Sequence, residues 1–370
     1  MKKMYLSLFV ALGSSMLLNA QNVNIPDANF KSYLVGNSAI NTNGDTEIQM
    51  SEAAAYSGEI NSSFLLITDL TGIEAFTALT GLKCQFNQLT TLNISANTAL
   101  TYLDCANNQL TTLDVSVNTS LTILNCDINQ LTTLDVSANT ALAILDCSHN
   151  HLTTLDVSVN TALKNLFCSA NELTTLDVSA NTVLKNLYCG KNQLTTLDVS
   201  ANTALTSLYC RYNQLTTLDV SANTALTGLY CDYNQLTTLN VKNGNNTKVK
   251  YFEAIFNPNL TCIQVDDATY STNNWTDIDA TASFSEDCSA SGINENFPSL
   301  ATSFYPNPTK NQIYFSVQTN VHLTNVTGQI IMDRKNVNTL DISAHPTGIY
   351  FLIFTDKKGQ VTQRSKIVKE

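Results

Sequence analysis

Eight cysteines recur every 21 residues, so redox and metal chemistry are the first activities to consider. The cysteines are Cys84, Cys105, Cys126, Cys147, Cys168, Cys189, Cys210 and Cys231. If successive turns stack as parallel strands ~4.8 Å apart, disulfides between neighbours are one interpretation, because that spacing lies within the Cα range of a disulfide. In-register strands, however, point neighbouring Cβ atoms the same way, and a single file offers no tetrahedral metal cluster. We therefore expect buried free thiols that pack as small hydrophobic side chains.

A second candidate for chemistry is the segment 41–52, whose oxygen-bearing side chains have the spacing of a calcium loop. The candidate metal ligands are Asn41, Asn43, Asp45, Glu47 and Glu52. This spacing resembles a single EF-hand-type loop, which takes oxygen ligands at positions one, three and five and a glutamate at position twelve. Asn41 replaces the usual first aspartate, and Thr46 replaces the glycine of the sharp turn. Two interpretations stay open, a Ca²⁺ site and a solvated loop within a helical cap, and no other cofactor is expected.

The sequence contains no recognisable catalytic set. The histidines are His149, His151, His322 and His345. The first two flank Asn150 in one repeat, and the neighbouring turns offer no matching metal ligands. No nucleophile–base arrangement recurs, so we expect a protein without enzyme activity.

Charge is distributed unevenly along the chain. Residues 21–301 carry 9 Lys and Arg against 26 Asp and Glu, a net charge of −17, whereas residues 302–370 carry 8 against 4. An acidic region of this size argues against nucleic acid and anionic membrane surfaces as partners. It suits cationic or neutral polymeric ligands, or divalent metal ions.

These residues belong to a repeat that runs from Leu79 to Val241 with a period of 21 residues. One turn, starting at Leu100, reads LTYLDCANNQLTTLDVSVNTS. The pattern L-x-x-L-x-C-x-x-N-x-L resembles the leucine-rich repeat, and its cysteine form is similar to that of bacterial internalin-like surface proteins. Each turn has six apolar side chains that it cannot bury alone, so the turns must stack into a solenoid. Alternation at 102–105 predicts a parallel β-sheet, and the second half of the turn predicts an extended arm with little helix.

Two asparagine columns and one aspartate column share this period. Asn108 and Asn118 represent the asparagine columns, which we interpret as structural, since an amide can both donate to and accept from buried backbone groups. Asp114 represents the aspartate column. Capping of local backbone is the favoured interpretation for these carboxylates, and cations held between them are the alternative.

The ends of the solenoid differ from the repeats. Residues 1–20 begin with Lys2 and Lys3, continue with a short apolar run and predict a signal peptide. We expect an N-terminal helical cap at 21–66, the solenoid with degenerate end turns at 67–265 and a C-terminal cap at 266–288. Cys262 and Cys288 lie outside the column and are expected to form a disulfide in an exported protein. No stretch of the chain predicts a transmembrane segment.

The C-terminal part has a different character. The polar stretch 289–301 predicts a linker, and short apolar runs in 302–370 predict an antiparallel β-sandwich. The blocks FYPNP at 304–308, TGQ at 327–329, GIYFL at 348–352 and KIVK at 366–369 resemble the C-terminal sorting domain of the type IX secretion system of Bacteroidetes. The resemblance implies contact with the secretion machinery and passage across the outer membrane of a Gram-negative bacterium. Release or surface attachment would follow.

Function is expected on the outward residues of the concave sheet, where side chains vary without affecting the core. The candidate ligand-binding residues are Phe167, Tyr188, Tyr209, Arg211, Tyr212, Tyr230 and Tyr233. Exposed aromatic clusters mark binding surfaces, although cross-strand aromatic pairs can also simply stabilise a sheet. We expect a monomeric, exported leucine-rich-repeat protein, secreted or at the cell surface, that recognises a protein or glycan ligand. A structural role in the cell envelope or matrix, with the solenoid as a spacer or self-association element, is the alternative.

Overall fold

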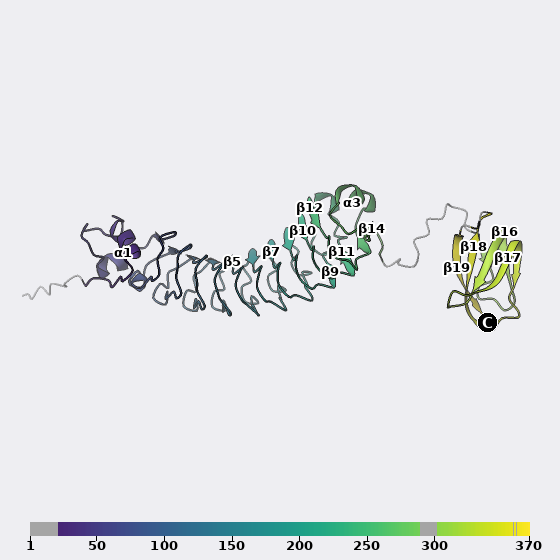
Figure 1. Ribbon diagram of the computed structural model, residues 1–370, viewed down its shortest axis with the longest axis horizontal. Helices are drawn as coiled ribbons and strands as arrows, with labels where there is room; N and C mark the ends of the chain where they lie inside the picture. The colour runs from purple at the N-terminus through teal and green to yellow at the C-terminus, as the bar shows by residue number, and fades with distance from the viewer. Residues whose placement is uncertain (1–20, 289–301, 358, 360) are drawn as a thin grey trace, which may run out of the picture. The chain divides into compact units, whose positions relative to one another are not determined.

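The computed structural model describes residues 21–288, 302–357, 359 and 361–370. The chain divides after Cys288 into two compact units, which are treated separately below (Figure 1). The predicted signal peptide at 1–20 and the predicted linker at 289–301 lie outside the described residues.

The N-terminal cap contains two short helices, α1 (Ala28–Val35) and α2 (Met50–Ala55). Asp27 caps α1, because one of its carboxylate oxygens accepts hydrogen bonds from the backbone N–H groups of Asn29 and Phe30 at 3.0 Å. The other oxygen accepts a hydrogen bond of 2.8 Å from the backbone N–H of Thr68. The same side chain therefore starts the helix and ties it to the first turn of the solenoid.

The solenoid is built on a ten-stranded parallel sheet, whose strands follow one another in chain order with β9 and β11 omitted. Its strands are β1 (Glu59–Asn61), β2 (Gly81–Lys83), β3 (Tyr102–Asp104), β4 (Ile123–Asn125), β5 (Ile144–Asp146), β6 (Asn165–Phe167), β7 (Asn186–Tyr188), β8 (Ser207–Tyr209), β10 (Gly228–Tyr230) and β12 (Tyr251–Glu253). Figure 1 shows the labelled strands β5, β7 and β10 along the concave side of this unit. The sheet already begins with β1, inside the range predicted as the N-terminal cap.

The second arm of each turn is extended, as the sequence predicts, and forms strands only near the C-terminal end. There, β9 (Thr217–Asp219), β11 (Thr238–Asn240), β13 (Cys262–Gln264) and β14 (Ser283–Ser285) pair in a four-stranded parallel sheet. Helical elements in the solenoid are limited to the short 3₁₀ segments η1 (Ile73–Ala75) and η2 (Asn246–Lys248) and to α3 (Ala268–Asn274) among the described residues. The predicted leucine-rich-repeat solenoid with little helix is confirmed.

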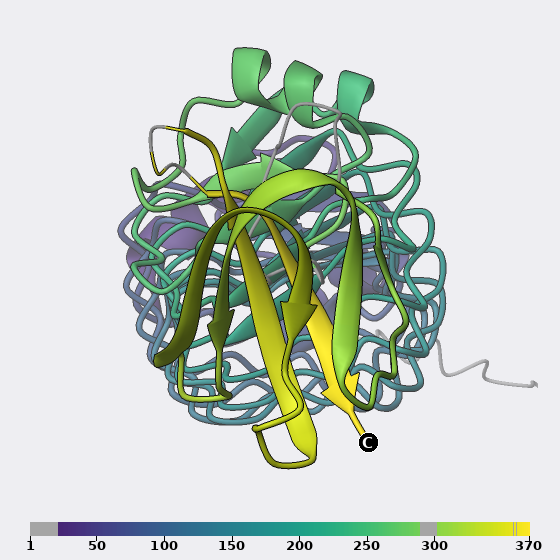
Figure 2. The ribbon, with the colours of Figure 1, turned by 90° about the vertical axis from the view of Figure 1, so that its right-hand side faces the viewer.

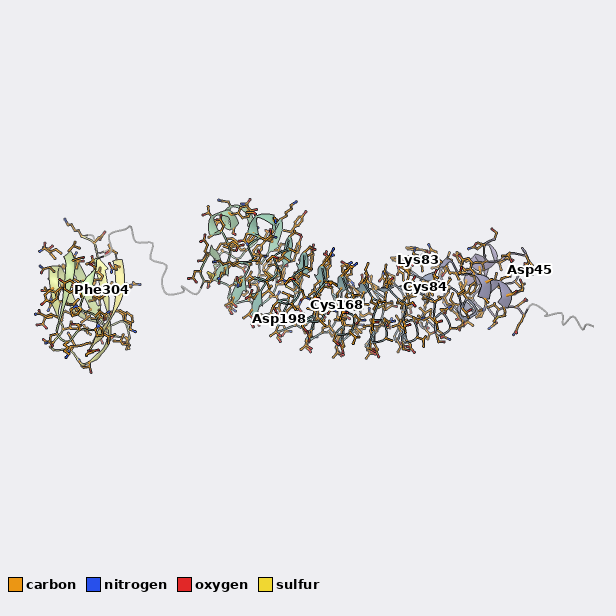
Figure 3. All side chains as sticks on the ribbon, turned by 180° about the vertical axis from the view of Figure 1, so that it is seen from behind. Asp45, Lys83, Cys84, Cys168, Asp198 and Phe304 are labelled. Atoms are coloured by element: carbon orange, nitrogen blue, oxygen red, sulfur yellow. A yellow bond between two sulfur atoms is a disulfide. The ribbon has the colours of Figure 1, made fainter. Side chains whose placement is uncertain are left out.

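The core contains the inward leucines and the cysteine column, which lie side by side in successive turns. All eight cysteines of the column are free and buried. Burial raises the pKa of each thiol, for example that of Cys189 to about 12, so the thiols stay protonated and pack as apolar groups. Figure 3 shows Cys84 and Cys168 within the body of the solenoid, with Lys83 on the side of the sheet.

The two asparagine columns form different hydrogen bonds. In the first column, Asn150 donates from Nδ2 to the carbonyls of Cys126 and Cys147 and accepts from the backbone N–H of Leu131 at 2.9 Å. In the second column, Asn160 donates from Nδ2 to two carbonyls at 3.0 and 2.9 Å, but its Oδ1 has no partner among the described residues. The prediction that both columns donate and accept therefore fits only the first column. In the second, the amide only donates, and its Oδ1 accepts no hydrogen bond among the described residues.

The C-terminal cap closes the core with aromatic side chains. Trp275, at the end of α3, stacks on Phe252 with 4.3 Å between ring centroids and donates a hydrogen bond of 3.2 Å to the Val249 carbonyl. A disulfide joins Cys262 in β13 to Cys288. These contacts cover the apolar side chains that the last turn would otherwise expose to water.

The C-terminal unit is an antiparallel sheet of β15 (Phe304–Tyr305), β16 (Gln312–Thr324), β17 (Ile330–Asp341), β18 (Gly348–Thr355) and β19 (Val361–Lys369). The predicted antiparallel β-architecture is confirmed, but the strands form one curled sheet rather than two separate ones (Figure 2). The reason is β16, which pairs with β15 in its first half and with β18 in its second. Its pairing with β17 along its length contains register shifts. The curl encloses a core that includes Ile313, Leu323 and Phe354.

Candidate functional site

An aromatic file occupies the last residue of four successive strands, immediately before the cysteine. It contains Phe167, Tyr188, Tyr209 and Tyr230, and we call it the strand ladder. In-register pairing brings its rings into contact because each strand places the same position directly beside its neighbour. Tyr209 and Tyr230 stack in parallel, whereas Phe167 meets Tyr188 edge to face. The centroids of Tyr188 and Tyr209 are 4.0 Å apart, and those of Tyr209 and Tyr230 are also 4.0 Å apart. Burial and a hydrogen bond to Tyr209 raise the pKa of Tyr188 to about 12, so the phenol remains a neutral donor.

A second aromatic file lies in the turn that follows each strand, two residues after the cysteine. It contains Tyr212, Tyr233 and Phe256, and we call it the turn ladder. Neighbouring rings in it are 4.2 Å apart, and the three side chains are 38%, 38% and 49% exposed. The two ladders are therefore distinct features of the concave side. The sequence places Tyr212 and Tyr233 on the sheet itself, whereas the structure places them in the turn beyond it.

The backbone of the turn ladder is strained. Tyr212, Tyr233 and Phe256 have φ angles of 54°, 52° and 60°, in the left-handed region that costs a bulky L-residue roughly 1–2 kcal/mol. Asn107, the residue type that tolerates this region best, occupies the same position in an earlier turn with φ of 52°. The equivalent residue of every regular turn has the same conformation, including Ile128 at 51° and Lys191 at 53°, so the repeat imposes it whatever the side chain.

Some members of the aromatic surface are not among the predicted site residues. Phe256 extends the turn ladder, and Tyr251 lies 6.5 Å from Tyr230 by ring centroid. A signal for Phe256 exists in the sequence, since Ala254 takes the cysteine position of the last turn and Phe256 follows it by two residues. At the other end of the solenoid, Phe64 and Phe86 stack at 4.3 Å in the same left-handed conformation.

Charged side chains connect the two ladders. Arg211 lies between them, 5.1 Å from the Tyr212 ring, and its Nη2 is 3.2 Å from Oδ2 of Asp232. The Asp232 side chain is almost fully buried, and its Oδ1 has no hydrogen-bond partner among the described residues. Burial raises the pKa of Asp232, while Arg211 partly offsets that effect. The pair places one guanidinium and one carboxylate directly beside the rings.

In the N-terminal half of the concave sheet, the position of the strand ladder is polar. Burial raises the pKa of Asp104 and of Asp146, which occupy the positions that aromatic residues take further along. His149 contacts Asp127 at 3.0 Å, and His151 contacts Glu172 at 3.3 Å, so each predicted lone histidine has a carboxylate neighbour. Such pairs on the surface contribute little to stability.

The predicted calcium ligands take part in hydrogen bonds within their own loop. Glu52 accepts from the backbone N–H groups of Thr42, Asn43 and Gln49. Asp45 accepts from the N–H of Glu47, Asn41 donates to the Asp45 carbonyl, and Glu47 pairs with Lys31. No group of three or more His, Cys, Asp or Glu side chains that could hold a metal occurs in the parts of the chain that the structure describes. This arrangement favours the hydrogen-bonded loop, and calcium binding stays a prediction.

The aspartate column caps local backbone. Asp114 accepts from the backbone N–H of Ser116 at 2.9 Å, and Asp198 does the same with Ser200. These hydrogen bonds lower the pKa of both carboxylates, which are therefore charged at neutral pH. Figure 3 labels Asp198 on the arm of the solenoid away from the strands.

Comparison with known proteins identifies the C-terminal end of the chain. Residues 303–370 match the family described as "Secretion system C-terminal sorting domain". The predicted sorting domain is confirmed. The chain is thus one that carries an export signal at its C-terminal end, and in the described residues no helix is long and apolar enough to cross a membrane. No curated protein matches the sequence.

Solved structures similar to this chain are leucine-rich-repeat proteins. The functional domain of InlJ from Listeria monocytogenes, whose description includes a cysteine ladder, is 27% identical, with 95% of this chain and 98% of that chain covered and a TM-score of 0.44. A leucine-rich-repeat protein of Leptospira interrogans is 24% identical over 54% of this chain and 58% of that one, with a TM-score of 0.47.

A third similar structure is the leucine-rich-repeat ectodomain of the plant receptor kinase GASSHO1/SCHENGEN3 from Arabidopsis thaliana, solved with CASPARIAN STRIP INTEGRITY FACTOR 2. It is 22% identical over 61% of this chain and 29% of that one, with a TM-score of 0.50. At this level of identity the similarity shows the fold alone.

Proposed function

We propose that this chain is an exported leucine-rich-repeat binding protein, secreted or displayed at the surface of a Gram-negative bacterium, without enzyme activity. It recognises a protein or glycan ligand through the C-terminal half of its concave face. The strand ladder and the turn ladder form that surface, with Arg211 between them. The secretion machinery handles residues 302–370.

The observation that supports the proposal most strongly is the exposed stack of aromatic rings in the turn ladder. Rings on neighbouring strands can be explained by sheet stability, because cross-strand aromatic pairs are worth roughly 0.2–1 kcal/mol each. The rings of the turn ladder lie beyond the strands, and the equivalent position holds Ala170 and Lys191 in other turns, so the backbone does not require an aromatic side chain there. Exposed aromatic clusters of this kind mark binding surfaces.

The geometry also limits how a ligand can approach. Rings 4.0–4.2 Å apart cover one another's faces, so a sugar ring cannot enter between them. A ligand meets ring edges along the turn ladder and at the stacked pair of Tyr209 and Tyr230. Elsewhere in the strand ladder the rings are tilted or edge to face. A protein surface with polar and apolar groups fits this strip more readily than a single sugar.

A binding screen with the purified full-length chain tests the proposal. We expect a saturable hit on an array of proteins and glycans that is lost when Tyr188, Tyr209 and Tyr230 are all replaced by alanine. The matched control replaces the exposed Thr154, Thr175 and Thr196 of the second arm by alanine and keeps the hit.

Circular dichroism verifies that both variants fold. A hit that survives in the tyrosine variant would refute the placement of the site. A well-folded chain with no hit would instead favour the spacer role.

A further inference from the structure

The surface beside the C-terminal end of both ladders carries an excess of carboxylates. Glu253 is paired in register with Tyr230 and so takes the next place in the file after the strand ladder. Asp232 lies one turn back, beside Arg211, and the backbone of Glu253 forms a bridge to that of Asp277. Asp279 follows at the end of the turn ladder, where its carboxylate accepts hydrogen bonds from the backbone of Phe256 and Asn257.

The carboxylates in this group are not neutralised by the cations around them. Burial and repulsion by Asp232 and Asp277 raise the pKa of Glu253, whereas Arg211 lowers it. Lys250 also lies at the groove between β12 and the C-terminal cap, but no salt bridge joins it to a carboxylate among the described residues. The group thus contains four carboxylates and two cations, and one oxygen of the buried Asp232 lacks a partner among the described residues.

Two of these carboxylates, Glu253 and Asp277, line a shallow groove. It has a volume of about 120 Å³ and lies between β12 and the segment that follows α3, with Tyr251, Glu253, Trp275 and Asp277 among its lining residues. The groove thus places the exposed Tyr251 ring and two carboxylates beside Lys250 at the end of the aromatic surface.

We propose that this acidic groove binds an arginine or lysine side chain of a protein partner whose surface covers the two ladders. The inference deepens the proposed function and rests on it. A carboxylate pair beside aromatic rings attracts a guanidinium or ammonium group by charge, and the rings contact its aliphatic stem. Arg211 shows the same chemistry within the chain, since it contacts both the Tyr212 ring and Asp232. The net charge of −17 in residues 21–301 would steer a basic partner towards this unit.

The test measures binding of an acetylated hexa-arginine peptide to the full-length chain, with a hexa-glutamate peptide as the comparison. We expect the arginine peptide alone to bind, and to bind more weakly as salt rises. The variant with Glu253→Gln and Asp277→Asn should lose at least about tenfold in affinity, equal to 1.4 kcal/mol. Both substitutions keep the shape of the side chain, so the fold is expected to survive.

The matched control changes the same net charge elsewhere, with Asp156→Asn and Asp177→Asn in the aspartate column. It should leave affinity unchanged, because its charges lie on the arm away from the sheet. Equal loss in both variants would mean that only net charge attracts the peptide, and would overturn the inference. No binding to the unaltered chain would also overturn it.

The proposed function is judged separately. A ligand from the array that depends on the tyrosines but not on Glu253 and Asp277 would support the binding surface and refute the cationic side chain. A neutral glycan as the ligand would likewise support the binding surface and refute the cationic side chain. A ligand that depends on both sets of residues supports both proposals.

Discussion

The different hydrogen bonding of the two asparagine columns predicts different costs for the same substitution. Asn150→Ala and Asn160→Ala remove buried amides from one repeat, and both leave a similar small void. After Asn150→Ala, the Leu131 N–H loses its Asn150 acceptor and becomes a buried donor without a partner. The carbonyls of Cys126 and Cys147 each keep a second asparagine donor.

Asn160→Ala leaves no backbone group without a partner. The Val136 carbonyl still accepts from the backbone N–H of Asn139, and the Asn139 carbonyl still accepts from that of Leu142. The substitution also removes the unpartnered Oδ1. Since an orphaned buried group costs about 1–3 kcal/mol, Asn150→Ala should destabilise the solenoid by about 2 kcal/mol more than Asn160→Ala.

Denaturant unfolding of the two variants measures this difference, and hydrogen exchange of the Leu131 amide locates it. We expect faster exchange at Leu131 in Asn150→Ala and little change there in Asn160→Ala. An equal loss in the free energy of unfolding for the two variants, or a larger loss for Asn160→Ala, would refute this explanation from hydrogen bonds. The hydrogen bonds that Nδ2 donates to carbonyls would then contribute more to stability than the one that Oδ1 accepts from the Leu131 N–H.

Three further predictions concern charge, the cap and calcium. Burial raises the folded-state pKa of Asp146, so the stability that its protonated form contributes is lost as pH rises through that pKa. Asp146→Asn should therefore stabilise the chain at pH 7 and have no effect on stability well below about pH 4. Urea unfolding at both pH values measures this. Cys288→Ser opens the disulfide to Cys262, which spans 26 residues, and should cost about 3 kcal/mol, with increased hydrogen exchange confined to the C-terminal cap; unchanged exchange there would contradict the role of the bond. Calcium at about 1 mM, a concentration that fills even weak extracellular calcium sites, should leave the melting temperature unchanged. The reason is that Glu52 and Asp45 already accept hydrogen bonds within the loop. A rise in melting temperature that Glu52→Gln abolishes would show the calcium site instead.

The fold was predictable because its strongest constraint is periodic. Leu103, Cys105 and their equivalents must point inward in every turn, and an unslipped period permits only one stacking register. The blocks of the sorting domain are equally local in sequence. The single curled sheet was not predictable, because it depends on register shifts within β16 that no short pattern indicates.

The candidate site was predictable only in part. Sequence spacing predicts that the strand ladder is contiguous, since Tyr188, Tyr209 and Tyr230 repeat every 21 residues. The left-handed backbone at Tyr212 was not visible, because the strand is only three residues long and alternation ends at its last residue. The ion pair of Arg211 and Asp232 joins neighbouring turns, so it appears only once the turns are stacked.

Replacing the turn ladder by asparagine tests the central claim most directly. In the variant Tyr212→Asn, Tyr233→Asn and Phe256→Asn, relief of strain at about 1 kcal/mol per residue roughly offsets the loss of two ring stacks at about 0.5–1.5 kcal/mol each. We therefore expect the free energy of unfolding to change little while the full-length chain loses its ligand. A large loss of stability with binding retained would contradict the account and make the ladder a structural element of the solenoid.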